Sequence, residues 1–418
     1  MDKIVIEGGA RLAGEVSASG AKNAALPLIF SGLLSDEPLV LEGVPDVADI
    51  RTACRLLERL GARVESPGTG RLVLDCAGVA EQEAPYDLVR TMRASFLVLG
   101  PLLARFGRAR VSQPGGCAIG TRPIDIHLAA LARLGARIER DGGYVEARAS
   151  ELRGSHCILS LPSVGATENL LMAASLARGL TRIENAAREP EIVDLARALQ
   201  ARGARIEGAG TSVIEVEGVE RLSGGEHRVI PDRIEAGTYL IAAAMTGGDV
   251  LVRGARAEHL GVLIEKLEEA GVAVEHGAGF VRASAGARPR SVDVTTAPYP
   301  GFPTDLQAQF MALMAVAEGT SVITETIFEN RFMHVPELNR MGADIRLSGR
   351  RAVVRGRNGL SGAPVMATDL RASVCLVLAG LAARSRTEVL RVYHLDRGYE
   401  RIEEKLSAIG ARIERVAV

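Results

Sequence analysis

The chain has 418 residues, 47% of them hydrophobic and 24% charged, which predicts a folded protein of two or three domains. A formal net charge of −1 argues against binding to nucleic acid or to an anionic membrane. Five cysteines, an odd number without a Cys-x-x-Cys spacing, argue against a disulfide framework and against a zinc site. The first residues alternate as a strand does, unlike a signal peptide, and the apolar stretches are too short to span a bilayer. We therefore expect a cytoplasmic protein.

One short pattern, Leu-x-x-x-Gly followed by a strand-like segment, occurs six times along the chain. Each copy is typical of the last turn of an amphipathic helix, a glycine in the left-handed conformation and a strand. The copies are spaced about 70 residues apart, which indicates six structural repeats. The repeat glycines are Gly61, Gly135, Gly203, Gly271, Gly342 and Gly410.

Each repeat begins with a helix rich in small residues, and a strand follows that helix. We expect the first helices at 23–34, 93–104, 167–177, 237–245, 305–317 and 371–383. We expect the strands that follow them at 38–44, 108–113, 181–186, 249–255, 320–327 and 387–393. The order within a repeat is therefore helix, strand, amphipathic helix and two further strands.

Six such units predict an α/β protein with two domains of three units, because one unit cannot bury both faces of its sheet alone. The break is expected near 225–232, where a polar, Gly-rich stretch precedes the fourth unit. The Ala, Gly and Ser of the first helices suit a crowded interior where helix backbones come close together.

The loop of the second unit, "QPGGCAIGTRPIDIH" at 113–127, is the longest of its kind and holds Cys117 among glycines. An inserted loop on a rigid scaffold is a common place for functional residues. An exposed thiol beside Arg122 is expected to have a lowered pKa. The remaining cysteines lie in helix or strand patterns and are interpreted as packing residues: Cys54, Cys76, Cys157 and Cys375.

Charged and polar residues recur at equivalent places in the repeats. Helix starts carry Lys22 with Asn23, Arg93, Thr167, Asp305 and Arg371, and the variable loops carry Arg122, Arg331 and Arg397. Each alone is typical of a helix cap or a solvated surface residue. Together they predict a cationic pocket for a substrate rich in phosphate and carboxylate groups. No nucleotide-cofactor, metal or protease-triad motif is present, so we expect chemistry without a cofactor or metal.

Eight segments in order resemble the UDP-N-acetylglucosamine 1-carboxyvinyltransferase family of enolpyruvyl transferases. They are "SGAKNAALP", "PGGCAIGTRPIDIHL", "SVGATENLLMAA", "IPDRIEAGTY", "YPGFPTDLQAQFMAL", "IFENRFMHVPEL", "DLRAS" and "YHLDRGYERIEEKL". The resemblance implies a two-domain inside-out α/β barrel, with three βαβαββ repeats per domain and internal helices. It implies domains at 22–229 and at 1–21 plus 230–418, with the active site in the cleft between them.

The resemblance also implies the reaction. The 3-hydroxyl of UDP-N-acetylglucosamine adds to C2 of phosphoenolpyruvate while C3 takes a proton, and the tetrahedral intermediate then loses phosphate. This is the first committed step of peptidoglycan synthesis. The family pattern makes Cys117 the acid at C3 and the thiol that fosfomycin alkylates, and Asp305 the base toward the 3-hydroxyl.

The implied binding residues fall into two sets. Those for phosphoenolpyruvate are Lys22, Asn23, Arg122, Arg331, Arg371 and Arg397. Those for UDP-N-acetylglucosamine are Arg93, Arg122, Pro123, Ile124, Asp125, Ile126, His127, Leu161, Pro162, Ser163, Val164, Gly165, Asp305 and Ile327. Some family members have a lysine before "SVGAT" where this chain reads "SLPSVGAT", so that contact does not carry over. Asp232 and His394 fit the family pattern without an assigned role.

Other readings remain open at this point. The sister enzyme that uses shikimate 3-phosphate has the same fold, although it does not rely on a loop cysteine. A catalytically silent binder of the nucleotide sugar and a generic repeat scaffold are further alternatives. We expect the 113–122 loop to close over bound nucleotide sugar. No nucleic-acid or membrane partner is indicated, and a monomer is compatible with the sequence.

Overall fold

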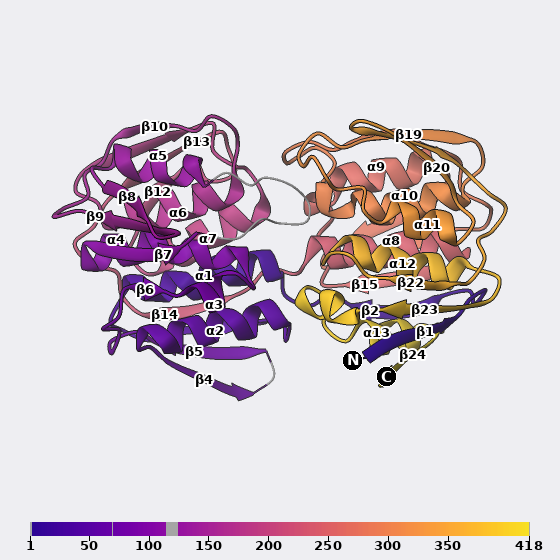
Figure 1. The fold of residues 1–418 in the computed structure, drawn as a ribbon, viewed down its shortest axis with the longest axis horizontal. Helices are drawn as coiled ribbons and strands as arrows, with labels where there is room; N and C mark the ends of the chain where they lie inside the picture. The colour runs from indigo at the N-terminus through magenta and orange to yellow at the C-terminus, as the bar shows by residue number, and fades with distance from the viewer. Residues whose placement is uncertain (1, 69, 114–123, 418) are drawn as a thin grey trace. The chain divides into compact units, whose positions relative to one another are not determined.

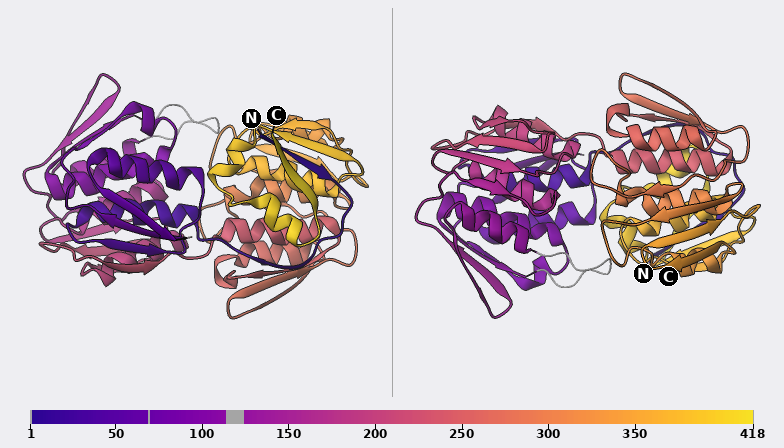
Figure 2. Two further views of the ribbon diagram at one scale, coloured as in Figure 1. Left: turned by 90° about the horizontal axis from the view of Figure 1, so that it is seen from below. Right: turned by 90° about the horizontal axis from the view of Figure 1, so that it is seen from above.

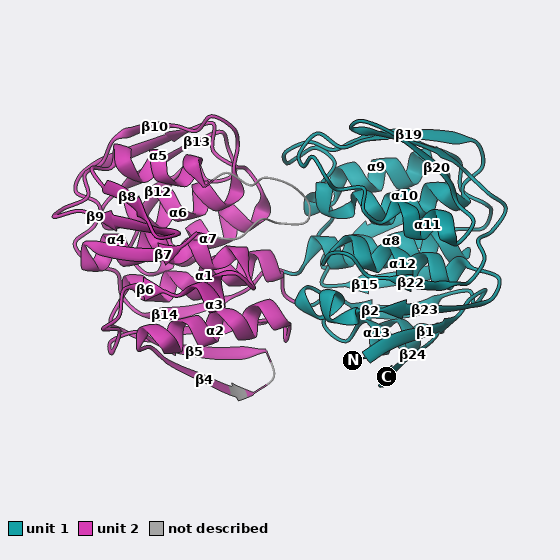
Figure 3. Cartoon of the chain, in the orientation of Figure 1, with its two compact units in different colours: residues 1–19, 117–121, 231–418 teal, residues 20–116, 122–230 magenta. Residues whose placement is uncertain are grey.

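The computed structural model describes residues 2–68, 70–113 and 124–417. These residues divide into two compact units (Figure 3). One unit takes the described residues up to 19 and from 231 onward, and the other takes those between 20 and 230. Cys117, Arg122 and Pro123 lie outside the described residues.

The unit of residues 20–230 contains three four-stranded sheets. Their orders are β14-β3-β5-β4, β6-β7-β9-β8 and β10-β11-β13-β12. The strands are β3 (Leu39–Glu42), β4 (Arg63–Gly68), β5 (Arg71–Asp75), β6 (Glu83–Ala84), β7 (Arg108–Ser112), β8 (Arg137–Asp141), β9 (Tyr144–Arg148), β10 (His156–Ile158), β11 (Leu180–Glu184), β12 (Arg205–Glu207), β13 (Val213–Glu217) and β14 (Gly225–Arg228).

The unit built from the two ends of the chain also contains three four-stranded sheets, β16-β17-β15-β2, β18-β19-β21-β20 and β22-β23-β1-β24. The strands are β1 (Asp2–Glu7), β2 (Ala13–Ser17), β15 (Asp249–Arg253), β16 (Ala273–Gly277), β17 (Phe280–Ser284), β18 (Val294–Thr295), β19 (Thr320–Thr324), β20 (Asp344–Ser348), β21 (Arg351–Arg355), β22 (Pro364–Met366), β23 (Arg386–Leu390) and β24 (Arg412–Ala417). Every sheet in both units combines one parallel pair with two antiparallel pairs.

Strands from distant parts of the sequence complete some of these sheets. β1 pairs antiparallel with both β23 and β24, and β2 pairs parallel with β15. β14, which lies in the polar stretch where a break was expected, pairs parallel with β3. This stretch is therefore a structural strand as well as a connection.

Helices fill the inside of each unit, and the sheets lie outside them (Figures 1 and 2). The inner helices are α1 (Lys22–Ser31), α4 (Leu99–Phe106) and α6 (Val164–Ala174) in one unit, and α8 (Arg233–Thr246), α10 (Gln307–Val316) and α12 (Ala372–Ala382) in the other. Every residue of α10 is buried, as expected for a helix that is apolar on all sides. At Gly100 in α4, an added Cβ would lie 2.5 Å from the Asn169 carbonyl oxygen of α6, so the two backbones approach closely. The predicted crowded interior is confirmed.

The amphipathic helices and short 3₁₀ turns complete the repeats. The helices are α2 (Ala48–Leu60), α3 (Tyr86–Val89), α5 (Asp125–Arg133), α7 (Pro190–Ala201), α9 (Gly261–Glu269), α11 (Val335–Arg340) and α13 (Ile402–Ala408). The 3₁₀ turns are η1 (Gly32–Leu34), η2 (Arg93–Val98), η3 (Ala257–His259), η4 (Thr304–Leu306) and η5 (Val392–Arg397). All six repeat glycines have φ between 88° and 104°, which confirms the predicted left-handed helix ends.

Some predicted helix starts were wrong by a few residues. α6 begins at Val164 because Ser163 caps it, accepting from the Ala166 amide, so Thr167 lies inside the helix and donates to the Ser163 carbonyl. α8 begins at Arg233 because Asp232 accepts from the Ile234 and Glu235 amides. Among the described residues, no helix is long and apolar enough to cross a bilayer.

Candidate active site

Polar residues gather where the inner helices begin. In the unit built from the chain ends, Asp305 lies in η4, immediately before α10, and Arg371 is the residue before α12. In the other unit, Lys22 is the first residue of α1 and Arg93 begins η2. The amide groups exposed at helix starts favour anions, and the cations add to this preference.

Asp305 is held by two of the predicted arginines. Its Oδ1 accepts from Arg331 Nη2 at 2.8 Å, and its Oδ2 lies 3.5 Å from Arg371 Nε. Arg331 is 4% exposed and Arg371 2% exposed. The structure therefore brings together three residues that the sequence predicted separately, and it fixes the orientation of the Asp305 carboxylate.

Arg371 stays charged in this buried position. Burial alone lowers the pKa of its guanidinium, but the carboxylates of Asp232 and Asp305 and the hydroxyl of Tyr399 raise that pKa above the ordinary value. Asp232 Oδ2 lies 3.4 Å from Arg371 Nη2, and the guanidinium carbon lies 5.3 Å from the centre of the Tyr399 ring. A charged Arg371 stabilises negative charge at Asp305.

Arg397 and His394 share the 3₁₀ turn η5, and Arg397 is half-buried. Burial, followed by the charge of Arg397, lowers the pKa of His394. His394 is thus a neutral neighbour of Arg397 at neutral pH. Ile327 follows β19, and its amide donates to Glu325 Oε1 at 2.8 Å.

In the unit of residues 20–230, Lys22 forms a buried pair with Asp49. Lys22 Nζ lies 3.4 Å from Asp49 Oδ2, and Lys22 is only 7% exposed. Asp49 comes from the first turn of α2. The pair holds the ammonium at the start of α1, where Asn23 is the next residue.

His127, Arg93 and Gly165 also lie together. Burial, then the charge of Arg93, lowers the pKa of His127 to about 4, so its ring is neutral at pH 7. Asn169 Nδ2 lies 3.1 Å from His127 Nδ1, which places the ring hydrogen on Nε2. A Cβ added at Gly165 would lie 3.2 Å from His127 Cε1. The neutral imidazole therefore packs directly on the first turn of α6.

The other predicted nucleotide-sugar residues of this unit flank His127 or Gly165 in the sequence, and they differ in how exposed they are. Ile124 precedes α5, Asp125 pairs with Arg140, and Ile126 is half-buried. Leu161 is 49% exposed, and it leads through Pro162 and Ser163 into Val164 and Gly165 of α6. Their contacts with substrate stay predictions.

The described cysteines behave as packing residues. Cys76, Cys157 and Cys375 are buried, and Cys54 is half-buried. Burial raises the pKa of Cys54 and of Cys76 to about 11, so these thiols stay protonated at neutral pH. Within the described ranges, no group of three or more His, Cys, Asp or Glu could hold a metal ion.

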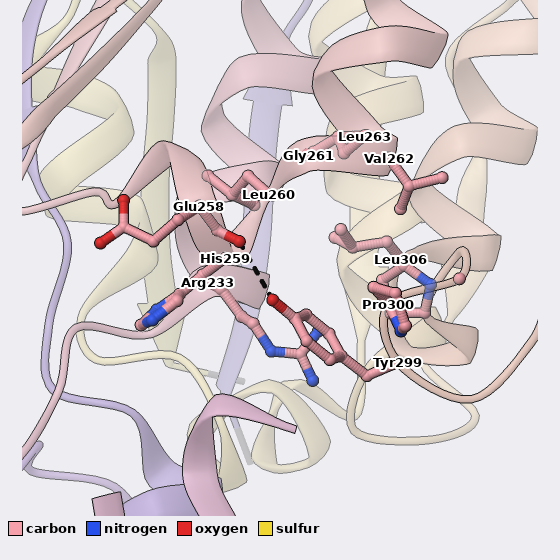
Figure 4. Close-up of a pocket in the computed structure, with 12 residues that line it drawn as sticks. Arg233, Glu258, His259, Leu260, Gly261, Val262, Leu263, Tyr299, Pro300 and Leu306 are labelled. Atoms are coloured by element: carbon pink, nitrogen blue, oxygen red, sulfur yellow. Dashed lines mark hydrogen bonds between the residues drawn. The ribbon is translucent and has the colours of Figure 1, made fainter. Parts of the chain in front are cut away.

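A small pocket lies beside η4, on the side of α8 and α9 (Figure 4). The Tyr299 hydroxyl donates to the Glu258 carbonyl at 3.0 Å, and the Arg233 guanidinium lies 5.6 Å from the centre of the Tyr299 ring. Pro303 and Leu306, which flank Thr304 and Asp305, line its wall. None of the predicted site residues that the structure describes lines this pocket.

A sequence model of EPSP synthase (3-phosphoshikimate 1-carboxyvinyltransferase) matches residues 6–406. Two curated relatives are named UDP-N-acetylglucosamine 1-carboxyvinyltransferase, one from Granulibacter bethesdensis and one from Nitratidesulfovibrio vulgaris. They are 60% and 59% identical to this chain, and each match covers 100% of both sequences. The chain belongs to the UDP-N-acetylglucosamine 1-carboxyvinyltransferase family. The resemblance drawn from the eight segments is confirmed.

Solved structures of two enolpyruvyl transferases share the fold of this chain. The enolpyruvyl transferase NikO from Streptomyces tendae matches with a TM-score of 0.90 and 27% identity, over 100% of this chain and 99% of that one. EPSP synthase from Acinetobacter baumannii matches with a TM-score of 0.78 and 20% identity over 100% of both chains, and this likeness shows the fold alone. The predicted two-domain inside-out α/β fold is confirmed.

Sequence reasoning missed the acidic partners in this member of the UDP-N-acetylglucosamine 1-carboxyvinyltransferase family. Asp49 holds Lys22, and Asp232 holds Arg371. Thr304 and Glu325 connect to Arg331 and to Ile327. Asp232 stood in a family segment without a role, and its place directly before a helix was the one signal that could have drawn attention to it.

Proposed function

We propose that this protein transfers the enolpyruvyl group of phosphoenolpyruvate to the 3-hydroxyl of UDP-N-acetylglucosamine and releases phosphate. The relatives' name describes a carboxyvinyl transfer to this nucleotide sugar. The observation that carries the proposal is the Asp305 carboxylate, whose Oδ1 accepts a hydrogen bond from Arg331 and whose Oδ2 forms an ion pair with Arg371 at 3.5 Å. Under the same proposal, this reaction is the first committed step of peptidoglycan synthesis.

In the proposed first step, Asp305 takes the proton of the sugar 3-hydroxyl while the hydroxyl oxygen forms a bond to C2 of phosphoenolpyruvate. The electron pair of the C2–C3 double bond takes a proton at C3, which Cys117 donates. In the second step, C3 gives a proton to the Cys117 thiolate and the double bond re-forms. The C2–O bond to phosphate breaks, and the proton held by Asp305 passes to the departing phosphate. The sum is one enolpyruvyl ether and one phosphate, without a redox change.

The cations have separate tasks in this proposal. Lys22, Arg122 and Arg397 bind the phosphate that becomes the leaving group. Arg331 and Arg371 each contact Asp305, so we propose that they keep this carboxylate ionised and oriented. Their predicted contact with the substrate carboxylate stays a prediction. Neutral His127, beside Gly165, belongs to the nucleotide-sugar side of the site.

Replacement of Asp305 by Asn tests the proposal. We expect Asp305→Asn to lower kcat by about 10²- to 10⁴-fold, because the amide cannot take the proton. Asp293→Asn is the matched control, since among the described residues that exposed carboxylate accepts a hydrogen bond from the Val322 amide of β19. Phosphate release that is unchanged in Asp305→Asn would remove Asp305 from the role of base.

A further inference from the structure

Glu325 is a buried carboxylate that neither the sequence nor the proposed reaction accounts for. It follows β19 directly and is 1% exposed. Its Oε1 accepts from Thr296 Oγ1 at 2.9 Å and from the Ile327 and Phe328 amides at 2.8 and 3.2 Å. Its Oε2 accepts from Thr304 Oγ1 at 2.9 Å. Four donors facing two oxygens fit a carboxylate rather than the protonated acid.

Thr304 links Glu325 to Arg331 through two hydrogen bonds whose donors and acceptors are fixed. Arg331 Nη1 donates to Thr304 Oγ1 at 3.0 Å, and a guanidinium has no acceptor. The single hydroxyl hydrogen of Thr304 therefore points at Glu325 Oε2. These two hydrogen bonds leave the other nitrogen of Arg331, Nη2, free to donate to Asp305 Oδ1 at 2.8 Å.

The same carboxylate joins three segments of one unit. Thr296 follows β18, Thr304 belongs to the turn that carries Asp305, and the amides of Ile327 and Phe328 begin the loop that leads to Arg331. Each segment is bound through a hydrogen bond to an ionised acceptor, which is stronger than one between neutral groups. A shift of Glu325 would therefore move Asp305 and Arg331 together.

We propose that Glu325 is a positioning residue of the transfer reaction: through Thr304 and Arg331 it sets the orientation of the Asp305 carboxylate toward the sugar hydroxyl. The inference rests on the proposed function. Glu325 contacts no substrate in this account and acts only through its hydrogen-bonded neighbours.

The substitution Glu325→Gln breaks this chain selectively. The oxygen of the new glutamine side chain can keep the hydrogen bonds from Thr296, Ile327 and Phe328. Its amide nitrogen then faces Thr304. Thr304 Oγ1 then receives two donors, one from this amide nitrogen and one from Arg331, and its own hydrogen loses the acceptor it has now. Arg331 must shift to relieve this conflict, and Asp305 shifts with it.

The experiment measures phosphate release by the full chain with phosphoenolpyruvate and UDP-N-acetylglucosamine. Glu325→Gln and Thr304→Val are each expected to lower kcat between about tenfold and 100-fold, with KM for both substrates within threefold of wild type. The double variant is expected to be no slower than Thr304→Val alone, because both changes cut one chain. Thr304→Ser keeps the hydroxyl and is expected to restore kcat to within threefold of wild type.

Three results would overturn the inference while leaving the proposed function intact: kcat within twofold of wild type in Glu325→Gln, rate losses that multiply in the double variant, or a Thr304→Ser variant as slow as Thr304→Val. If Glu325→Gln does not fold, Thr304→Val decides alone, and an unchanged kcat overturns the inference. A wild-type protein that releases no phosphate overturns the proposed function and this inference with it.

Discussion

Asp232 performs two tasks at once: it caps helix α8 and pairs with Arg371. Its Oδ1 accepts from the Ile234 and Glu235 amides at 2.8 and 3.1 Å, and its Oδ2 lies 3.4 Å from Arg371 Nη2. The start of one inner helix thereby holds the arginine at the start of another. Because Arg371 in turn faces Asp305, the cap of α8 supports the proposed base.

The two tasks of Asp232 can be separated by substitution. Asp232→Asn keeps an oxygen for the cap but loses the charge, and we expect it to lower the free energy of unfolding by about 3 kcal/mol. Asp232→Ala also loses the cap, which adds about 1 kcal/mol. Urea unfolding of both variants measures this difference. Equal stability of Asp232→Asn and wild type would show that the ion pair contributes nothing.

Gly165 is expected to matter for the nucleotide sugar because of its contact with His127. In Gly165→Ala the new Cβ lies 3.2 Å from His127 Cε1, so the ring must move by a few tenths of an ångström. We expect KM for UDP-N-acetylglucosamine to rise by about tenfold, equivalent to ~1.4 kcal/mol, with kcat nearly unchanged.

Gly261→Ala is the control for that change. Gly261 also lies at the start of a helix. Beyond its chain neighbours and its own helix backbone, none of the described atoms lies within 4 Å of a Cβ added there. We expect unchanged kinetics in Gly261→Ala. An equal rise of KM in both variants would mean that the effect of Gly165→Ala does not come from His127.

Two histidines, the buried His334 and the half-buried His127, predict how stability depends on pH. The pKa of His127 and of His334 falls from 6.5 to about 4, in both cases because burial disfavours the charged ring. The unfolded chain therefore binds more protons than the folded one between pH 6.5 and 4. Their contribution to stability is complete above pH 6.5 and is lost as the pH falls toward 4, by about 1.4 kcal/mol per pH unit for each ring.

Removal of one histidine tests this pH dependence. In His127→Gln the loss of unfolding free energy between pH 6.5 and 4 is expected to be smaller than in wild type by the contribution of the His127 ring. Urea unfolding at several pH values measures this loss. A slope identical to that of wild type would place the His127 pKa near its ordinary value in the folded protein.

The repeats could be predicted from the sequence because their signals are local. Gly61 and the five equivalent glycines end helices through their own backbone conformation, and this requirement shows in the sequence. The pairing of β1 with β24 could not be predicted from periodicity, because the strand pattern of residues 2–7 fits any sheet that has an open edge.

The candidate site also contains residues that the sequence could predict and residues that it could not. Lys22, Arg93, Asp305 and Arg371 were found because they recur at helix starts in the repeats. The carboxylates that hold the cations were missed: Asp232 and Arg371 are 139 residues apart. An acid next to a helix start is also fully explained as a cap, so its second partner leaves no trace in the sequence.

Phosphate release from phosphoenolpyruvate tests the central claim most directly, with UDP-N-acetylglucosamine and shikimate 3-phosphate compared as acceptors, before and after treatment with fosfomycin. We predict release with UDP-N-acetylglucosamine alone, abolished by alkylation of Cys117. Release with shikimate 3-phosphate, or with neither acceptor, would contradict the proposed function.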